Sequence, residues 1–210
     1  MVFYLIGWCK LKTYKRNTSE YTTKVSVVIP ARNEQGNIEN WLNDIAKQDF
    51  PKELFEIIVV DDNSTDSTVE RIEELIDPGN HTGTGRYNEI NTTLIKLKDN
   101  KDDSCSPPKV LEGKKDAITK AIEQSEGELI VTIDADCRMG RHWLSTIVSY
   151  YESKRPKMIV APVCLQSPEC SGSFFEKLQT LEFIGLIGIT GAAIEQKHPI
   201  MCNGANLAYE

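Results

Sequence analysis

One short stretch, Leu129–Asp136, constrains the fold of this chain more than any other part of the sequence. Residues 129–133 are all apolar or β-favouring, and two acids, Asp134 and Asp136, follow them closely. A buried strand that ends in this way places two carboxylates at the carboxyl edge of a sheet, which is where open α/β sheets bind ligands. Two carboxylates this close repel each other unless a cation lies beside them, and Mg²⁺ or Mn²⁺ prefers such oxygen ligands. The alternative is an Asp-rich turn without a ligand.

The apolar residues alternate along the chain between strand-like runs and helix-like spacing. Apolar and β-branched runs predict strands at residues 24–30, 54–60, 93–97, 128–133 and 158–163. Apolar positions at i, i+3 and i+4 predict helices at residues 38–46, 69–76, 113–122 and 143–151. This order of elements predicts an α/β fold with a parallel sheet and right-handed crossovers.

The composition is that of a globular protein with one sizeable core. The chain has 210 residues, of which 40% are hydrophobic and 26% charged, both ordinary values. Its net charge of −7 argues against a nucleic-acid partner, which would require a basic face. The six cysteines contain no CxxC pair, so neither a zinc site nor a disulfide framework is indicated, and we expect reduced thiols in the cytosol.

Residues 1–23 form a separate basic and aromatic segment in our prediction, and residues 24–210 form one domain. Residues 1–9 are apolar but too few to span a bilayer, and no small-residue cleavage site accompanies them. The aromatic side chains and the lysines that follow, Lys10, Lys12 and Lys15, suit the end of a membrane anchor or an interfacial segment. A disordered tail is the alternative.

The most hydrophobic helix-like stretch of the chain is Phe183–Ile194. Its twelve residues are too few to cross a bilayer, so we predict a core helix of the domain. Its small residues, among them Gly185, Gly188 and Gly191, indicate close backbone packing or, as the alternative, an interfacial segment.

Three loops are expected at the same edge of the sheet: Pro30–Glu34, Asp61–Ser64 and Asp134–Asp136. Lys114 follows a glycine at a predicted helix start, where a cation and free backbone N–H groups favour phosphate. Together these features describe a site for a nucleoside diphosphate. The pair Gly83-Thr-Gly85 neither follows a strand nor opens a clear helix, so we do not interpret it as a phosphate loop.

With these motifs the chain resembles the family 2 glycosyltransferases of the GT-A fold. The matching pieces are residues 25–34, 59–66, 113–118, 131–136 and 203–206, in the order and at the approximate spacing of that family. The resemblance covers residues 24–210. It implies a Rossmann-like, three-layer α/β/α sandwich around a mostly parallel sheet.

The resemblance also implies roles for individual residues. Asp62 would accept a hydrogen bond from the base, and Asp61 would support the turn or cap a helix. Asp134 would contact the ribose or the metal ion, and Asp136 would bind the metal ion that bridges the diphosphate. The implied donor-binding set is Pro30, Ala31, Arg32, Glu34, Asp61, Asp62, Lys114, Asp134 and Ala135, with Asp136 and Asp134 as ligands of Mg²⁺ or Mn²⁺.

The function that the resemblance implies is metal-dependent, inverting transfer of a sugar from a nucleotide-diphosphate donor, with a UDP-sugar favoured, to an acceptor hydroxyl. We expect a glycan or lipid-linked acceptor, as in polysaccharide biosynthesis, and a cytoplasmic location at the inner face of the cell membrane. We also expect the chain to be a piece of a longer protein whose general base lies beyond Glu210. One alternative is a catalytically inactive nucleotide-sugar-binding or interaction domain. Another is a sugar nucleotidyltransferase, which would carry a Gly-rich loop where Pro30–Glu34 has no glycine.

Overall fold

The computed structural model describes residues 2–17, 20–76, 90–97, 113–165 and 173–210. The chain divides into two compact units, one made of Met1–Lys15 and Val160–Asn206 and the other of Arg16–Ile159 and Leu207–Glu210. The sequence pattern indicates a boundary only after residue 23 and does not predict that the N-terminal segment groups with residues 160–206. The Gly83-Thr-Gly85 pair lies outside the described residues.

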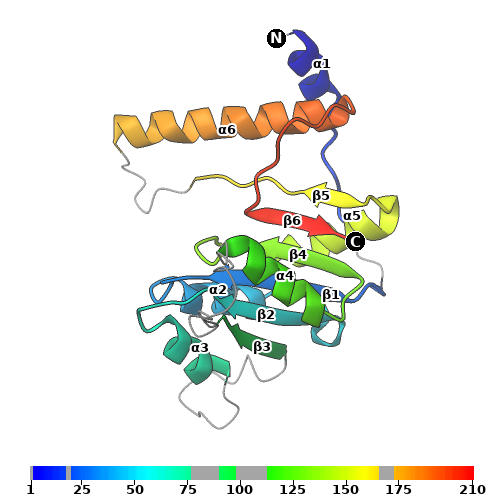
Figure 1. Cartoon of the computed structure of the whole chain (residues 1–210). Coiled ribbons are helices and arrows are strands. Elements are labelled where there is room, and N and C mark those ends of the chain that lie inside the picture. Colours follow the sequence, from blue (N-terminus) through cyan, green and yellow to red (C-terminus); the bar gives the residue numbers. More distant parts are fainter. Residues whose placement is uncertain (1, 18–19, 77–89, 98–112, 166–172) are drawn as a thin grey trace, which may run out of the picture. The chain divides into compact units, whose positions relative to one another are not determined.

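Six strands form one sheet in the order β3-β2-β1-β4-β6-β5 (Figure 1). β1 pairs in parallel with β2 and with β4, and β2 pairs in parallel with β3, so the carboxyl ends of these strands lie at one edge. β5 is shorter than predicted, and Pro162, which has no N–H to donate, lies just beyond its end. The strands are β1 (Val25–Ala31), β2 (Phe55–Asp61), β3 (Asn91–Lys96), β4 (Leu129–Ile133), β5 (Met158–Val160) and β6 (Asn206–Tyr209).

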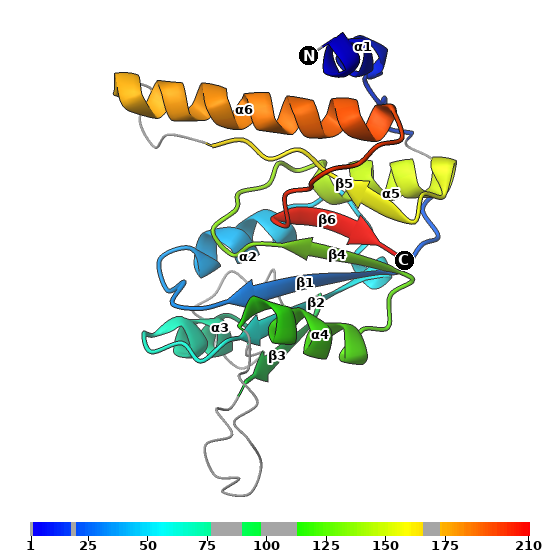
Figure 2. The ribbon, with the colours of Figure 1, turned by 45° about the horizontal axis from the view of Figure 1, so that its top comes forward.

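Helices cover both faces of the sheet (Figure 2). Because side chains alternate along a strand, Val27 and Ile29 of β1 pack into one core with helices α2, α3 and α5, whereas Val28 packs with α4 into the other. The predicted three-layer α/β/α arrangement is therefore confirmed. The helices are α2 (Ile38–Ala46), α3 (Thr68–Ile76), α4 (Lys114–Gln124) and α5 (Trp143–Lys154), with a 3₁₀ turn at Lys52–Leu54.

Helix α2 illustrates why the elements form where the sequence predicts them. Ile38, Trp41, Leu42 and Ile45 follow helical spacing, and each is at most 1% exposed. Burial of a large apolar side chain contributes roughly 1.5–3 kcal/mol to the free energy of folding, so these four side chains hold α2 firmly against the sheet.

The unit made of residues 1–15 and 160–206 contains two helices, α1 (Val2–Lys10) and α6 (Phe174–Glu195), which pack against each other. Residues Val2–Lys10 are therefore helical, and the disordered-tail alternative does not hold for them. Helix α6 begins with a capping box, in which Ser173 accepts from the Glu176 N–H and Glu176 accepts from the Ser173 N–H.

The prediction of a core helix at Phe183–Ile194 is wrong. The helix has 22 residues, and within the predicted stretch Ile184 and Leu186 are 48% and 44% exposed. Polar residues between positions 176 and 182 interrupt the apolar run, so the pattern concealed the first nine residues, which the capping box and good helix formers support. Among the described residues, α6 is the one helix that is long and apolar enough to cross a membrane by length and composition.

Candidate functional site

The ends of three parallel strands form the base of the candidate site. Ala31 at the end of β1 lies opposite Asp61 at the end of β2, and the Asp62 N–H donates to the Ala31 carbonyl at 2.9 Å. On the other side of β1, β4 ends at Ile133 and Asp134 follows. The structure thus brings together the three loops that the sequence predicts at this edge.

Hydrogen bonds that the sequence analysis missed join the β1–α2 and β2–α3 loops. The Asn33 side-chain oxygen accepts from the Thr65 N–H at 2.8 Å, and the Asn33 N–H donates to Ser64 Oγ at 2.9 Å. The Glu34 N–H donates to the Thr68 hydroxyl at 2.7 Å. Asn33 has a φ of 58°, in the left-handed region that asparagine adopts more readily than most residues. That preference is the one signal in the sequence for this role.

The predicted residues in and after β1 differ in how much they can offer a ligand. Pro30 is half-buried and Ala31 is buried. The Glu34 carboxylate accepts from the Asn37 side chain at 2.8 Å, next to the start of α2. The Arg32 side chain is 63% exposed. Arg32 is therefore the most accessible side chain of this group.

Asp61 and Asp66 shape the second loop. The buried Asp61 carboxylate lies 3.3 Å from the Ser64 N–H, which donates to it, so Asp61 supports the turn. Asp66 Oδ1 accepts from the Thr68 N–H at 3.0 Å and from the Thr68 hydroxyl. Hydrogen bonding to Thr68 lowers the pKa of Asp66. Both acids thus stabilise the loop and the start of α3.

Asp62 is the acid of this loop that faces the site. It is 8% exposed, and Arg32 Nη1 lies 3.6 Å from its Oδ2. A Cβ added to Gly113 would lie 3.3 Å from the same oxygen, so the start of α4 is close to Asp62. Gly113 has a φ of 55°, a conformation that strains any residue with a side chain.

Lys114, the first residue of α4, connects this region to the acid pair after β4. Its ammonium forms an ion pair with Asp134 Oδ1, and the two side chains are 46% and 32% exposed. The free N–H groups at a helix N-terminus favour anions, and the lysine adds a positive charge. This arrangement can bind a phosphate.

Asp134 and Asp136 lie on either side of the buried Ala135. Both act on the neighbouring thiol of Cys137, whose pKa is raised to about 11 by burial and by the charges of Asp136 and Asp134. Asp136 is exposed and Asp134 half-buried, so both carboxylates are accessible from outside. The prediction that the strand delivers two acids to this edge is confirmed.

A divalent cation fits this donor set only if the ligand completes its coordination. Among the described residues, no group of three or more His, Cys, Asp or Glu side chains could hold a metal ion. Protein-bound Mg²⁺, however, is commonly held by one or two carboxylates together with water and substrate phosphates. Asp134 and Asp136 supply two such carboxylates, and the Lys114 ammonium lies beside Asp134.

The loop that follows the acid pair is anchored to α2. Asp44 accepts from Arg138 Nε at 2.6 Å and Nη2 at 2.9 Å, and the Met139 N–H donates to it at 3.3 Å. The Gln48 amide donates to the Gly140 carbonyl at 2.9 Å. Burial alone would raise the pKa of Asp44, but the hydrogen bonds from Arg138 and Met139 outweigh it and lower that pKa.

We did not predict this anchor, although the sequence contains one signal for it. Asp44 lies at helical spacing from Trp41, on the buried side of α2, where an acid requires a partner. The partner itself, 94 residues further along the chain, has no signature.

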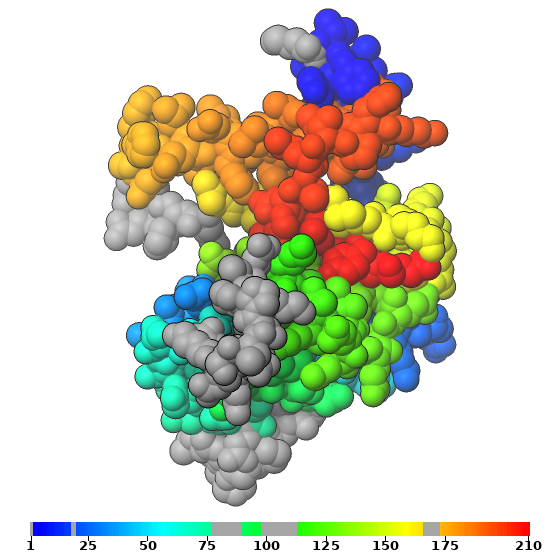
Figure 3. Space-filling view, viewed as in Figure 1, coloured from blue at the N-terminus to red at the C-terminus, as the bar shows by residue number. Residues whose placement is uncertain are grey.

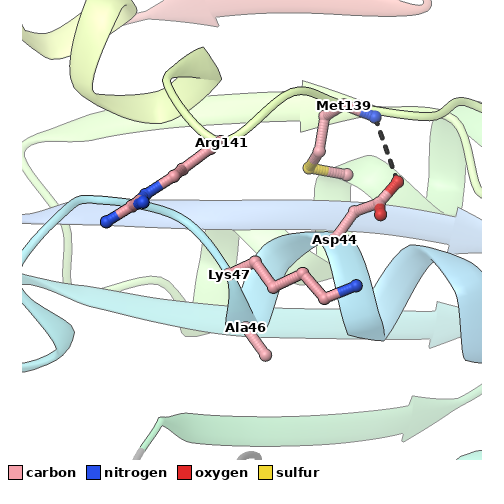
Figure 4. Close-up of a pocket in the computed structure, with 5 residues that line it drawn as sticks. All are labelled: Asp44, Ala46, Lys47, Met139 and Arg141. Atoms are coloured by element: carbon pink, nitrogen blue, oxygen red, sulfur yellow. Dashed lines mark hydrogen bonds between the residues drawn. The ribbon is translucent and has the colours of Figure 1, made fainter.

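The predicted donor residues do not line either of two hollows that the described residues form. An open one of about 460 Å³ lies beside the anchored loop (Figure 4). A second of about 220 Å³ lies at the amino ends of the strands, next to Val25, Phe55 and Gly127. We base the site on the strand ends, where the charged groups converge. The residues that line the first hollow are Asp44, Ala46, Lys47, Met139 and Arg141.

Sequence comparison places the chain among glycosyltransferases. The poly(ribitol-phosphate) β-N-acetylglucosaminyltransferase TarS of Staphylococcus aureus is 29% identical over 137 residues, which cover 65% of this chain and 20% of TarS. The probable glycosyltransferase YdaM of Bacillus subtilis is 31% identical over 136 residues, covering 62% of this chain and 28% of YdaM. This chain therefore spans only about a fifth to a quarter of the length of these curated relatives.

Solved structures agree. The structure of the mannosyltransferase PcManGT of Pyrobaculum calidifontis, in complex with GDP-Man and Mn²⁺, aligns with a TM-score of 0.66 and 21% identity. The alignment covers 99% of this chain and 51% of the PcManGT chain, and it shows the fold. Residues 1–349 of S. aureus TarS, in complex with UDP-GlcNAc, match 71% of this chain and 36% of their own with a TM-score of 0.50 and 27% identity. The family model described as glycosyl transferase family 2 matches residues 26–100 and 107–198. This chain therefore belongs to glycosyl transferase family 2 and has the GT-A fold.

Proposed function

We propose that this chain is the donor-binding part of a metal-dependent, inverting glycosyltransferase. The enzyme would move a sugar from a nucleotide-diphosphate donor, with a UDP-sugar favoured, to a hydroxyl of a glycan or lipid-linked acceptor. The observation that carries the proposal is the convergence of Asp62, Lys114, Asp134 and Asp136 at the carboxyl edge of the sheet.

Asp62 and Arg32 would form the nucleoside end of the site. A mostly buried carboxylate with one weak ion pair retains the capacity to accept a hydrogen bond from a base N–H. Arg32 can cover the base with its exposed guanidinium. The TarS structure contains UDP-GlcNAc, which supports uracil as the base. The mannosyltransferase structure contains GDP-Man, so guanine must be tested as well.

Lys114 and the acid pair would form the diphosphate end. A divalent cation held by Asp134 and Asp136 would neutralise the charge that develops on the leaving nucleoside diphosphate. Lys114, which already lies against Asp134, would contact a phosphate oxygen directly and add to that stabilisation. Since Ala135 between the two acids is buried, the strand end holds both carboxylates in place.

The acceptor end requires one general base and a single displacement, which inverts the anomeric centre. Glu210 does not suit this role, because its carboxylate pairs with Lys157 at 2.5 Å and lies 3.3 Å from the Tyr151 hydroxyl. The hydrogen bond from Lys157 lowers the pKa of Glu210, which weakens it as a base. We therefore do not assign the general base to Glu210.

A thermal-shift panel tests the donor site. UDP, GDP and their sugar conjugates are added with and without Mn²⁺, and we expect one nucleotide series to raise the melting temperature more with Mn²⁺ than without it. Asp136→Ala should remove the metal-dependent part, whereas Glu70→Ala, an exposed acid on α3, should not. No shift with any nucleoside diphosphate would overturn the proposal.

The second candidate, a catalytically inactive donor-binding domain, remains open because the chain spans only part of its relatives. It predicts the same thermal shifts but no release of nucleoside diphosphate from the sugar nucleotide, with or without an acceptor, when the full-length protein is assayed. A sugar nucleotidyltransferase would instead release pyrophosphate from a nucleoside triphosphate and a sugar phosphate.

We also infer that the full-length protein works at the cytoplasmic face of a membrane. The aromatic and basic N-terminal residues support this location, and Trp8 in α1 is 56% exposed. A transferase with a lipid-linked acceptor would require such a location.

A further inference from the structure

Helices α1 and α6 display an unusual amount of apolar surface for a protein in water. On α6 the exposed side chains include Phe174 at 84%, Phe175 at 64% and Leu181 at 66%. On α1 they include Val2 at 69% and Leu5 at 56%. Figure 3 shows the side chains of both helices, blue and orange, on the surface of the molecule. Exposed apolar side chains in this number indicate an interaction site.

The two helices form one body through close backbone packing. Gly7 is buried against α6, where an added Cβ would lie 2.3 Å from the Ala192 carbonyl oxygen. The Trp8 ring lies against Gly188, where an added Cβ would be 2.9 Å from the ring. A side chain at position 7 would meet the α6 backbone, whereas one at position 188 would meet the Trp8 ring. Helices α1 and α6 are therefore closely packed against each other.

Basic residues lie at the end of this pair where the two helices meet. Lys10, Lys12 and Lys15 end and follow α1, and Lys197 follows α6. The described residues of this unit contain five lysines and three glutamates, so their charge is positive, whereas the whole chain has a net charge of −7. Apolar surface beside a local excess of lysine is complementary to a bilayer that contains anionic lipids.

The topology excludes the obvious way for α6 to meet a membrane, which is to cross it. Its 22 residues would span about 33 Å, enough for a bilayer core. But β5 before α6 and β6 after it belong to one sheet, and the Ala161 N–H donates to the Asn206 carbonyl at 3.1 Å. If α6 crossed, the chain would have to return through the lipid either in residues 161–173 or in residues 196–205. Residues 161–173 include Gln166, Pro168 and Glu169, which do not suit a segment inside lipid. The second possible return path is residues 196–205.

That return path is not feasible. Ten residues reach at most about 36 Å when fully extended, and residues 196–205 contain no helix or strand that would satisfy their backbone groups in lipid. They also include Lys197, His198 and Asn203.

We propose that α6, with α1 packed against it, is an interfacial membrane anchor: α6 lies in the interface of an anionic bilayer with its apolar side chains inserted and does not cross it. The anchor deepens the proposed membrane location, but its binding to lipid does not depend on nucleotide binding. It would keep the transferase at the surface where lipid-linked acceptors are found.

Vesicle flotation tests the anchor. The full chain should float with vesicles of phosphatidylcholine mixed with phosphatidylglycerol, and more weakly with phosphatidylcholine alone. Phe175→Ser/Leu181→Ser should weaken binding by about tenfold or more, because two large side chains no longer leave water. Ile122→Ser, which removes a 40%-exposed side chain of α4, should leave binding unchanged. Lys12→Glu/Lys15→Glu should reduce the preference for phosphatidylglycerol.

A second measurement separates lying in the interface from crossing. Cys202 is an exposed free thiol within residues 196–205. On intact vesicles a membrane-impermeant maleimide should label it fully, as mapped by mass spectrometry. Protection that detergent relieves would overturn the interfacial mode. Absence of flotation, or self-association through this face without lipid binding, would overturn the anchor. If the nucleotide-dependent thermal shift persists in that case, the proposed donor site survives.

Discussion

Replacement of Asp49 by asparagine should destabilise the unit made of Arg16–Ile159 and Leu207–Glu210 by an amount that depends on pH. The Asp49 carboxylate accepts from Ser145 Oγ at 2.5 Å, contacts His142 Nδ1 at 2.6 Å and forms an ion pair with Arg16. The Asp49 N–H also donates to the Arg141 carbonyl at 3.0 Å. Asp49 thus links the residues after α2 to the start of α5 and to Arg16.

The pKa of Asp49 sets the size of the effect. Burial would raise this pKa, but hydrogen bonds from Ser145, Arg16 and His142 outweigh it and lower the pKa from 3.8 to about 2. One pKa unit corresponds to about 1.4 kcal/mol, which gives an upper limit of about 2.5 kcal/mol at neutral pH. Because the His142 side chain is 60% exposed and the pair is partly screened, we expect about 1–2 kcal/mol.

The sign of the pH dependence follows from the lowered pKa. The contribution is fully present above the unfolded-state pKa of Asp49 and is lost as the pH falls toward its folded-state pKa of about 2. Urea denaturation at pH 7 should therefore show the full loss for Asp49→Asn, and at pH 3 about half of it.

A matched control is Glu73→Gln, which removes an exposed carboxylate that pairs with Lys96 at 2.6 Å. Exposed pairs contribute about 0–1 kcal/mol, so this variant should lose less stability than Asp49→Asn. A loss for Asp49→Asn that stays the same between pH 7 and pH 3 would refute the electrostatic reasoning.

Two further predictions concern packing and binding. Gly127→Ala should lower the free energy of unfolding, measured in urea, by about 1–3 kcal/mol, because the new Cβ would lie 2.4 Å from the Ser26 backbone nitrogen. Gly36→Ala is the control, because its Cβ would meet nothing within 4 Å. Equal losses of stability in the two variants would contradict the packing argument. Lys114→Met should weaken binding of UDP or GDP in calorimetry by about tenfold, the cost of one charge-assisted contact. Lys115→Met, one position further along α4, should bind normally, and an equal loss there would remove Lys114 from the site.

The sequence predicted the sheet and the strand ends well because local patterns determine both. Runs such as Val25–Ile29 can be buried only inside a sheet, and parallel strands must end at the same edge. The convergence of Asp62, Lys114 and Asp134 followed from that geometry.

Contacts between residues far apart in the chain could not be predicted from local sequence patterns. Nothing near Asp44 indicates Arg138, and nothing near Gly7 indicates Ala192, because these contacts join residues far apart in the chain. The error at α6 has a different cause. A count of apolar residues cannot distinguish a buried helix from an exposed one, and at α6 side chains that we predicted to be in the core, such as Ile184 and Leu186, are exposed.

The central claim is that the acid pair and a nucleoside diphosphate together hold a divalent cation. Electron paramagnetic resonance of free Mn²⁺ tests it directly, since the sharp signal of the free ion falls when the ion binds. We predict that the protein with UDP or GDP lowers this signal well beyond what either component achieves alone, and that Asp136→Asn restores it. A signal equal to that of Mn²⁺ with nucleotide alone, or one that Asp136→Asn leaves lowered, would contradict the claim.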